Sequence, residues 1–197
     1  MRAVVLTVDQ RSSRTGADLV PGALDRLAET AALPFERTAG DEIQGLFTEP
    51  GGVVTAVATL LRTGEWTIGV GIGVVEEPLP DHARAGRGSA YVHARKAVNR
   101  ARQAPQHVAV VGTPDYRAEQ VEAVLWLWAG VLSRRTERGW EVADLVATGL
   151  SHREVGERLG ISQSAVSQRA RVAGLVEARR AEQLVAQLVG EALRPRT

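Results

Sequence analysis

The strongest structural signal in the chain lies in residues 150–170, LSHREVGERLGISQSAVSQRA. Ser151 is followed three residues later by Glu154, a capping box that predicts the start of a helix. Gly160 is typical of the left-handed residue that ends a helix, and Ser162 can cap a second helix directly after it. The segment therefore predicts two short helices joined by a tight turn.

This segment divides into an apolar core and a polar outer face. Four apolar side chains have the spacing with which a helix-turn-helix buries its core: Val155, Leu159, Ile161 and Val166. Gly156 is small where the two helices would cross closely. Polar and basic side chains are left on the outer face of the second helix, where they can bind base edges or phosphates. The residues expected to contact DNA are Ser162, Gln163, Ser164, Ser167, Gln168, Arg169 and Arg171.

Residues 139–180 as a whole resemble the helix-turn-helix of LuxR-type regulators and of the sigma-factor region that contacts promoter DNA. The resemblance implies binding to double-stranded DNA and a role in transcription regulation. One helix-turn-helix covers too few base pairs for specific binding, so we expect a homodimer. Two other interpretations stay open: an αα-hairpin that only packs against the rest of the chain, and an adaptor that contacts RNA polymerase through the sigma-like helices.

No strand signal is found in residues 117–197, and residues 118–134 carry an apolar helical pattern. Trp126 and Trp128 face different sides of that helix, so we expect one in the core and the other at a subunit or domain interface. The sequence therefore predicts an all-α domain over residues 117–197, following a first domain over residues 1–116.

The first domain mixes β-branched, strand-like runs with helical patterns. The expected order is strand, helix, strand, strand, helix, strand, helix and strand, over residues 4–8, 23–32, 35–38, 43–47, 53–61, 66–75, 89–102 and 107–111. This order predicts an α+β, ferredoxin-like sandwich with the first strand central in an antiparallel sheet and the helices on one face. Gly69, Gly71 and Gly73 leave room either for a ligand or for a closely packed helix.

Composition excludes several classes of protein. The chain has 197 residues and no cysteine, which excludes disulfide scaffolds, thiolate nucleophiles and cysteine-ligated zinc. Residues 1–116 carry 12 basic and 13 acidic side chains, whereas residues 117–197 carry 12 and 10, typical of a neutral body followed by a nucleic-acid contact. The apolar run near the N-terminus is too short for a signal peptide or a membrane span, so we expect a cytoplasmic protein without a membrane partner.

Two carboxylates in the first domain form a candidate metal site. Asp9 ends the first strand, and Asp41 lies in the turn Gly40-Asp41-Glu42 between the next two strands. If the first strand is central, the two carboxylates converge, and their oxygens can bind Mg²⁺. Ordinary turn chemistry also explains acidic residues in a hairpin turn, so both interpretations stay open.

The first domain resembles the palm-like fold of class III nucleotidyl cyclases and GGDEF domains, and more closely the SatD family of bacterial proteins. The resemblance spans residues 4–102. Its motifs are Val8-Asp9 with Ser13-Arg14, Gly40-Asp41-Glu42-Ile43-Gln44-Gly45-Leu46, Gly71-Ile72-Gly73 and Gly88-Ser89-Ala90-Tyr91-Val92-His93-Ala94-Arg95. It implies Mg²⁺ bound by Asp9 and Asp41. It also implies a nucleotide or cyclic dinucleotide contacted by Ser12, Ser13, Arg14, Gly40 and Arg95.

The cyclase machinery is incomplete in this sequence, so we assign no catalytic residue. Tyr91 stands where cyclases have an asparagine, and no base-reading lysine–aspartate pair is found. We therefore expect a transcriptional regulator whose degenerate cyclase-like domain senses a nucleotide or dimerises. The alternative is a Mg²⁺-dependent nucleotidyl cyclase or nucleotidyltransferase-like enzyme with an appended DNA-binding domain.

Overall fold

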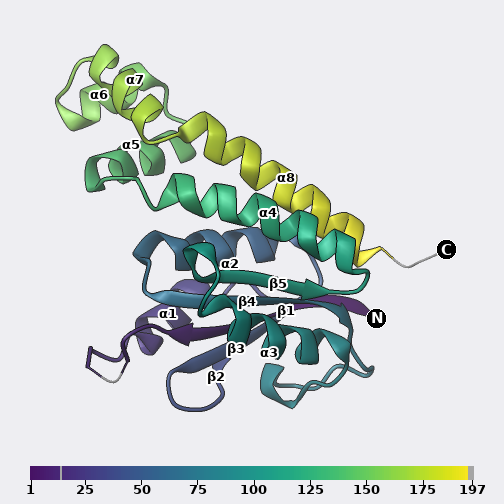
Figure 1. Ribbon diagram of the computed structural model, residues 1–197. Coiled ribbons are helices and arrows are strands. Elements are labelled where there is room, and N and C mark those ends of the chain that lie inside the picture. Colours follow the sequence, from purple (N-terminus) through teal and green to yellow (C-terminus); the bar gives the residue numbers. More distant parts are fainter. Residues whose placement is uncertain (14, 195–197) are drawn as a thin grey trace.

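Residues 1–13 and 15–194, which the computed structural model describes, form an N-terminal mixed five-stranded sheet packed with helices, followed by an all-helical region (Figure 1). The strands are β1 Arg2–Gln10, β2 Leu33–Arg37, β3 Glu42–Phe47, β4 Trp66–Val74 and β5 Val108–Gly112. The helices of this sheet body are α1 Val20–Leu27, α2 Pro50–Thr63 and α3 Ser89–Ala101, with 3₁₀ turns η1 Ala83–Ala85 and η2 Pro105–His107. The helical region consists of α4 Asp115–Leu132, α5 Glu137–Ala147, α6 His152–Leu159, α7 Gln163–Val172 and α8 Leu175–Leu193. The predicted α+β class is confirmed.

The sheet has the order β2-β3-β1-β4-β5, so β1 lies at its centre, as predicted. β1 pairs antiparallel with both β3 and β4. β5 pairs parallel with β4, and the expectation of a wholly antiparallel sheet is therefore wrong for its last strand. The reason is α3, which crosses the sheet between these two strands and returns the chain in the direction of β4.

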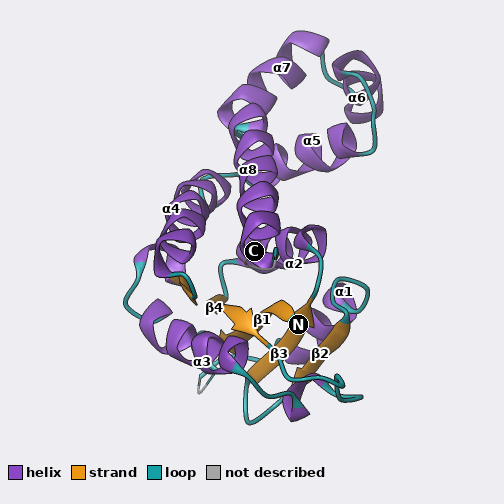
Figure 2. Ribbon diagram, turned by 90° about the vertical axis from the view of Figure 1, so that its right-hand side faces the viewer, coloured by secondary structure: helices purple, strands orange, loops and turns teal. Residues whose placement is uncertain are grey.

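Helices cover both faces of the sheet, whereas the sequence predicted them on one face (Figure 2). Val4, Leu6 and Val8 belong to the core that α1 and α2 cover. Ala3 and Val5 belong to the core on the opposite face, which α3 covers. Because β1 is buried on both sides, its sequence is a nearly continuous apolar run instead of an alternating one.

Glycines in β4 let α3 lie very close to the sheet. A Cβ on Gly69 would lie 2.2 Å from the backbone nitrogen of Val98, and one on Gly71 would lie 2.2 Å from the carbonyl oxygen of Ala90. A larger residue at either position would therefore push α3 away from the sheet. Of the two interpretations of the glycine pattern, close helix packing accounts for it without a ligand.

α4 and α8 run side by side and connect the sheet body to α5, α6 and α7, which we call the three-helix group (Figures 1 and 2). Val121, Leu125 and Trp128 of α4 are buried in the same apolar core as the sheet residues. Val185 and Val189 of α8 are buried there as well. The connection is therefore a continuous apolar core and not a flexible linker.

Side chains from α3 and α4 close the outer edge of β5. The Trp126 indole N–H donates to the carbonyl oxygen of Val108 at 2.7 Å. The Glu122 carboxylate accepts from the Val110 N–H at 2.7 Å, and Arg100 donates to the Val110 carbonyl oxygen at 2.6 Å and pairs with Glu122. An otherwise unpaired strand edge is thus satisfied, and Trp126 lies where the sheet body meets the helical region.

The three-helix group has a small apolar core of its own, separate from that of the sheet body. Its buried residues are Val142 from α5, Val155 from α6, and Val166 and Ala170 from α7. No helix in the described part of the chain is long and apolar enough to cross a membrane.

Candidate functional site

The ends of α6 and α7 are formed by the residues that the sequence indicated. The Ser151 hydroxyl accepts from the Glu154 N–H at 3.4 Å, and the Glu154 carboxylate accepts from the Ser151 N–H at 2.8 Å, which completes the predicted capping box. These hydrogen bonds from Ser151 hold the pKa of Glu154 below its usual range. Gly160 ends α6 with a φ of +65°. The Ser162 hydroxyl accepts from the Ala165 N–H at 3.2 Å and caps α7.

Gly156 sits at a close contact between α6 and the turn that leads to α7. A Cβ at this position would lie 2.7 Å from the carbonyl oxygen of Ile161. Val155 and Val166 are fully buried on either side of this contact. The close approach predicted at Gly156 is therefore confirmed, and it brings α7 into a fixed position on α6.

Five of the seven residues expected to contact DNA lie together on the outer face of α7. They are exposed and line one shallow hollow: Gln163, Ser164, Ser167, Gln168 and Arg171. The Ser162 hydroxyl lies 2.9 Å from that of Ser164, so the cap residue adjoins this face. The face offers amide, hydroxyl and guanidinium groups but no carboxylate among the residues lining the hollow.

Arg169 does not line the hollow on the outer face of α7; it shares a second hollow with Gln168. It is half-buried on the flank of α7 and lines this second hollow together with Arg134 and Thr136. Sequence reasoning missed Arg134, because a single arginine after an apolar helix carries no distinguishing signal. It also missed His152, whose Nδ1 lies 3.0 Å from the Ser167 hydroxyl and links α6 to the outer face of α7.

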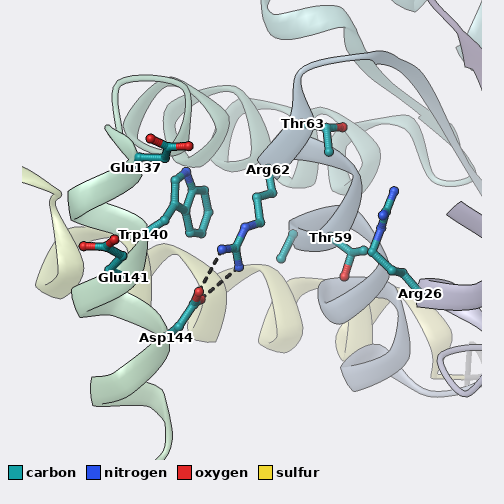
Figure 3. A pocket seen from close by; sticks show the side chains of 9 residues that line it. Arg26, Thr59, Arg62, Thr63, Glu137, Trp140, Glu141 and Asp144 are labelled. Atoms are coloured by element: carbon teal, nitrogen blue, oxygen red, sulfur yellow. Dashed lines mark hydrogen bonds and ion pairs between the residues drawn. The ribbon is translucent and has the colours of Figure 1, made fainter. Parts of the chain in front are cut away.

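An acidic cleft lies on one side of the three-helix group. The acidic side chains of α5, Glu137, Glu141 and Asp144, line a cleft of about 730 Å³ between α5 and α2 (Figure 3). Arg169 and Arg171 of α7 are not among the residues that line this cleft.

Asp9 and Asp41 lie close together at the end of β1, as the sequence predicted. Asp9 is opposite Glu42 in the β1–β3 pair, and the Asp41 carbonyl oxygen accepts from the Gln10 N–H at 3.3 Å. Burial raises the pKa of Asp9 above its usual range, and the nearby negative charge of Asp41 raises it further. Arg102 donates to Asp9 at 3.1 Å, and this contact only partly offsets the rise in the pKa.

Glu42 is a site residue that the sequence interpretation did not include. Its carboxylate accepts from both terminal nitrogens of Arg95, one of them at 2.7 Å, and from the Thr38 hydroxyl at 2.6 Å. Arg95, which the resemblance assigns to a nucleotide phosphate, is therefore paired with a carboxylate here. The strand register could have indicated Glu42, because it places Glu42 directly opposite Asp9.

The other predicted nucleotide contacts lie in two turns next to these carboxylates. Ser12 and Gly40 both have positive φ, +58° and +60°, which makes tight turns at the end of β1 and between β2 and β3. Ser13 is half-buried in the first of these turns. Arg14 lies outside the described residues.

Asp9 and Asp41 offer oxygen ligands of the kind that Mg²⁺ prefers. Among the described residues, no group of three or more His, Asp or Glu side chains is placed to hold a metal ion. A cation here would need further oxygens from a bound phosphate or from water. Arg95 and Arg102 lie beside these carboxylates, but Arg95 is paired with Glu42 and Arg102 with Asp9, so either would have to leave its partner to bind a phosphate.

Comparisons of the chain with protein-family models, with curated proteins and with solved structures found no significant match.

Proposed function

We propose that the chain is a DNA-binding transcriptional regulator in which α6 and α7 form a helix-turn-helix and α7 is the recognition helix. The observation that carries the proposal is the outer face of α7. Its hollow is lined by amide, hydroxyl and guanidinium groups, while Val166 and Ala170 on the opposite side of the helix are buried. Such groups bind base edges in the major groove and phosphates beside it. The three-helix group projects from the sheet body, which leaves room for a DNA duplex (Figure 1).

We propose further that the sheet body is a degenerate cyclase-like domain of the SatD type. Its first six elements alternate as β1, α1, β2, β3, α2 and β4, and their strands have the order β2-β3-β1-β4. This arrangement is typical of a ferredoxin-like sandwich and supports the resemblance. β5 extends the sheet at its edge, and α3 covers the second face.

In this proposal the sheet body senses a Mg²⁺–nucleotide or a cyclic dinucleotide at Asp9 and Asp41. The closeness of the two carboxylates is also the observation that favours the second candidate, a Mg²⁺-dependent nucleotidyl cyclase or nucleotidyltransferase-like enzyme. The pairing of Arg95 with Glu42 speaks against turnover, because it engages the guanidinium that a developing phosphate charge would need.

The regulator is proposed to act as a homodimer, because a palindromic operator is read by two recognition helices. We propose Leu127 of α4 as part of the contact between the two copies, since its side chain is 73% exposed.

DNA binding is tested by selecting duplexes that the purified protein retains from a random pool and measuring their affinity by fluorescence anisotropy. Arg171→Ala should weaken binding to the selected duplex by about 1–3 kcal/mol, which is a roughly 5- to 150-fold lower affinity. Arg84→Ala removes the same charge from an exposed position in the sheet body and serves as the matched control. Equal affinities of the two variants over a range of salt would overturn the assignment of α7.

Ligand binding is tested by thermal shift with ATP, GTP and cyclic dinucleotides, each with and without Mg²⁺. A ligand at 100 times its dissociation constant should stabilise the fold by about 2.7 kcal/mol. The shift should require Mg²⁺ and disappear in Asp9→Ala. Product formation from a nucleoside triphosphate that is lost in Asp41→Ala would instead favour the enzyme.

A further inference from the structure

Arg62, in the last turn of α2, connects the sheet body to α5 of the three-helix group (Figure 3). Its two terminal nitrogens donate to the two carboxylate oxygens of Asp144 at 2.9 and 2.7 Å. The guanidinium carbon lies 4.6 Å from the centroid of the Trp140 ring. A bidentate ion pair combined with a stacked ring restricts both the distance and the direction of the contact.

The same ring continues the connection toward the recognition helix. The guanidinium carbon of Arg135 lies 4.7 Å from the centroid of Trp140. The Nε of Arg135 donates to the carbonyl oxygen of Ala173 at 2.7 Å, and Ala173 is the residue that ends α7. Contacts therefore run without a gap from α2, through Trp140 and Arg135, to the end of α7.

The end of α2 is also hydrogen-bonded to the turn that follows β1. The backbone N–H of Arg11 donates to the carbonyl oxygen of Glu65 at 2.7 Å, and its side chain donates to that of Gly64 at 2.8 Å. Gly64 is the residue that ends α2. Arg11 lies between Asp9 and Ser12 in the sequence, so the proposed ligand site and the end of α2 share one short segment.

We infer that residues 62–65 couple the turn after β1 to the orientation of the three-helix group, with Arg62 as a positioning residue for α7. This inference rests on the proposed DNA-binding function. The three-helix group has its own core, so it can rotate as a unit when the contact at Arg62 changes. A ligand at Asp9 that displaces the turn after β1 would move Gly64, and Arg62 with it.

The expected effect is on orientation and only slightly on stability. The side chains of Arg62 and Asp144 are 46% and 50% exposed, and exposed ion pairs contribute little to the free energy of unfolding. Arg62→Gln should therefore leave the melting temperature nearly unchanged. Its affinity for the selected DNA should fall by about three- to tenfold, because the group then samples orientations that do not fit the operator.

Arg26→Gln is the matched control. Arg26 lines the same cleft and loses the same charge, yet it makes no hydrogen bond or ion pair with a described residue. Double electron–electron resonance measures the orientation directly, and the absence of native cysteines allows labels at Glu29→Cys in the sheet body and Glu157→Cys on α6. Arg62→Gln should broaden the distance distribution, and Arg26→Gln should not.

The reversed pair Arg62→Glu with Asp144→Arg should restore both the narrow distribution and part of the DNA affinity. An unchanged distribution in Arg62→Gln, or equal broadening in Arg26→Gln, would overturn the inference. The distances are measured without DNA. A broadened distribution in a protein that selects no DNA sequence would therefore support the coupling and refute the proposed function on which its purpose rests.

Discussion

Gly156→Ala tests whether the position of α7 depends on the close contact beneath it. The added methyl carbon would lie 2.7 Å from the Ile161 carbonyl oxygen, whereas ordinary contacts begin at 3.4 Å, so the turn before α7 must move by about 0.7 Å. Overpacking of this kind costs about 1–3 kcal/mol. Alanine is favoured over glycine in a helix by up to about 1 kcal/mol. The net loss of stability in the three-helix group should be about 1–2 kcal/mol.

Gly130→Ala is the matched control, because Gly130 is also helical but a Cβ there meets nothing within 4 Å. It should stabilise α4 by about 0.5–1 kcal/mol. Hydrogen exchange measures the stability of α4 separately from that of α6 and α7. The amides of α6 and α7 should exchange about 5- to 30-fold faster in Gly156→Ala, and affinity for the selected DNA should fall in parallel. If Gly156→Ala is as stable as Gly130→Ala, the contact is not tight and the account of how α7 is positioned is wrong.

Three further predictions concern single side chains. Ser151→Ala should lower the stability of α6, measured by hydrogen exchange, by about 0.5–2 kcal/mol. It should also reduce the loss of stability that the wild type shows as pH falls through the lowered pKa of Glu154, because only the backbone N–H of residue 151 still donates to that carboxylate. Asp9→Asn should melt at a higher temperature than the wild type at neutral pH without Mg²⁺. The raised pKa of Asp9 in the folded protein means that its ionised carboxylate opposes folding. Below pH 3.8 the carboxyl is mostly protonated in both the folded and the unfolded chain, so the difference in melting temperature should vanish. Leu127→Glu should convert the proposed dimer to a monomer in sedimentation, while Val92→Glu, which changes another exposed apolar residue, should not.

The sequence located α6 and α7 well because their end signals act within one turn of the chain. Ser151, Gly160 and Ser162 each form a cap with a neighbour at most five positions away, so no distant partner is needed to recognise them. α1 was placed less well. It spans Val20–Leu27 instead of 23–32, because Pro21 fits the first turn and Thr30 closes a turn on Leu27. Apolar residues after that turn still pack on the core, which extended the periodic pattern past the helix.

Features that depend on distant partners could not be predicted. The parallel direction of β5 and the position of α3 follow from how the chain crosses the sheet. The sequence of β5 fits a parallel or an antiparallel strand, and the sequence of α3 fits a helix on either face of the sheet. Glu42 and Arg95 are 53 residues apart, and Arg62 and Asp144 are 82 apart. The sequence around an exposed arginine does not show whether that arginine pairs with a distant carboxylate or is solvated.

The way the three-helix group is attached explains why a single exposed contact can matter for DNA reading. α4 and α8 lead into and out of the group, and they are side by side and anchored in the sheet core, so together they fix its distance from the body. The two points at which α4 and α8 join the group define one line, and rotation of the group about that line remains possible. A contact away from the line is needed to fix the rotation, and the pairing of Arg62 with Asp144 on α5 is such a contact. In the proposed complex with DNA, rotating α7 by a few degrees would move Gln168 and Arg171 away from the base pairs they contact. In this proposal the end of α2, which is hydrogen-bonded to Arg11 in the turn after Asp9, controls that rotation.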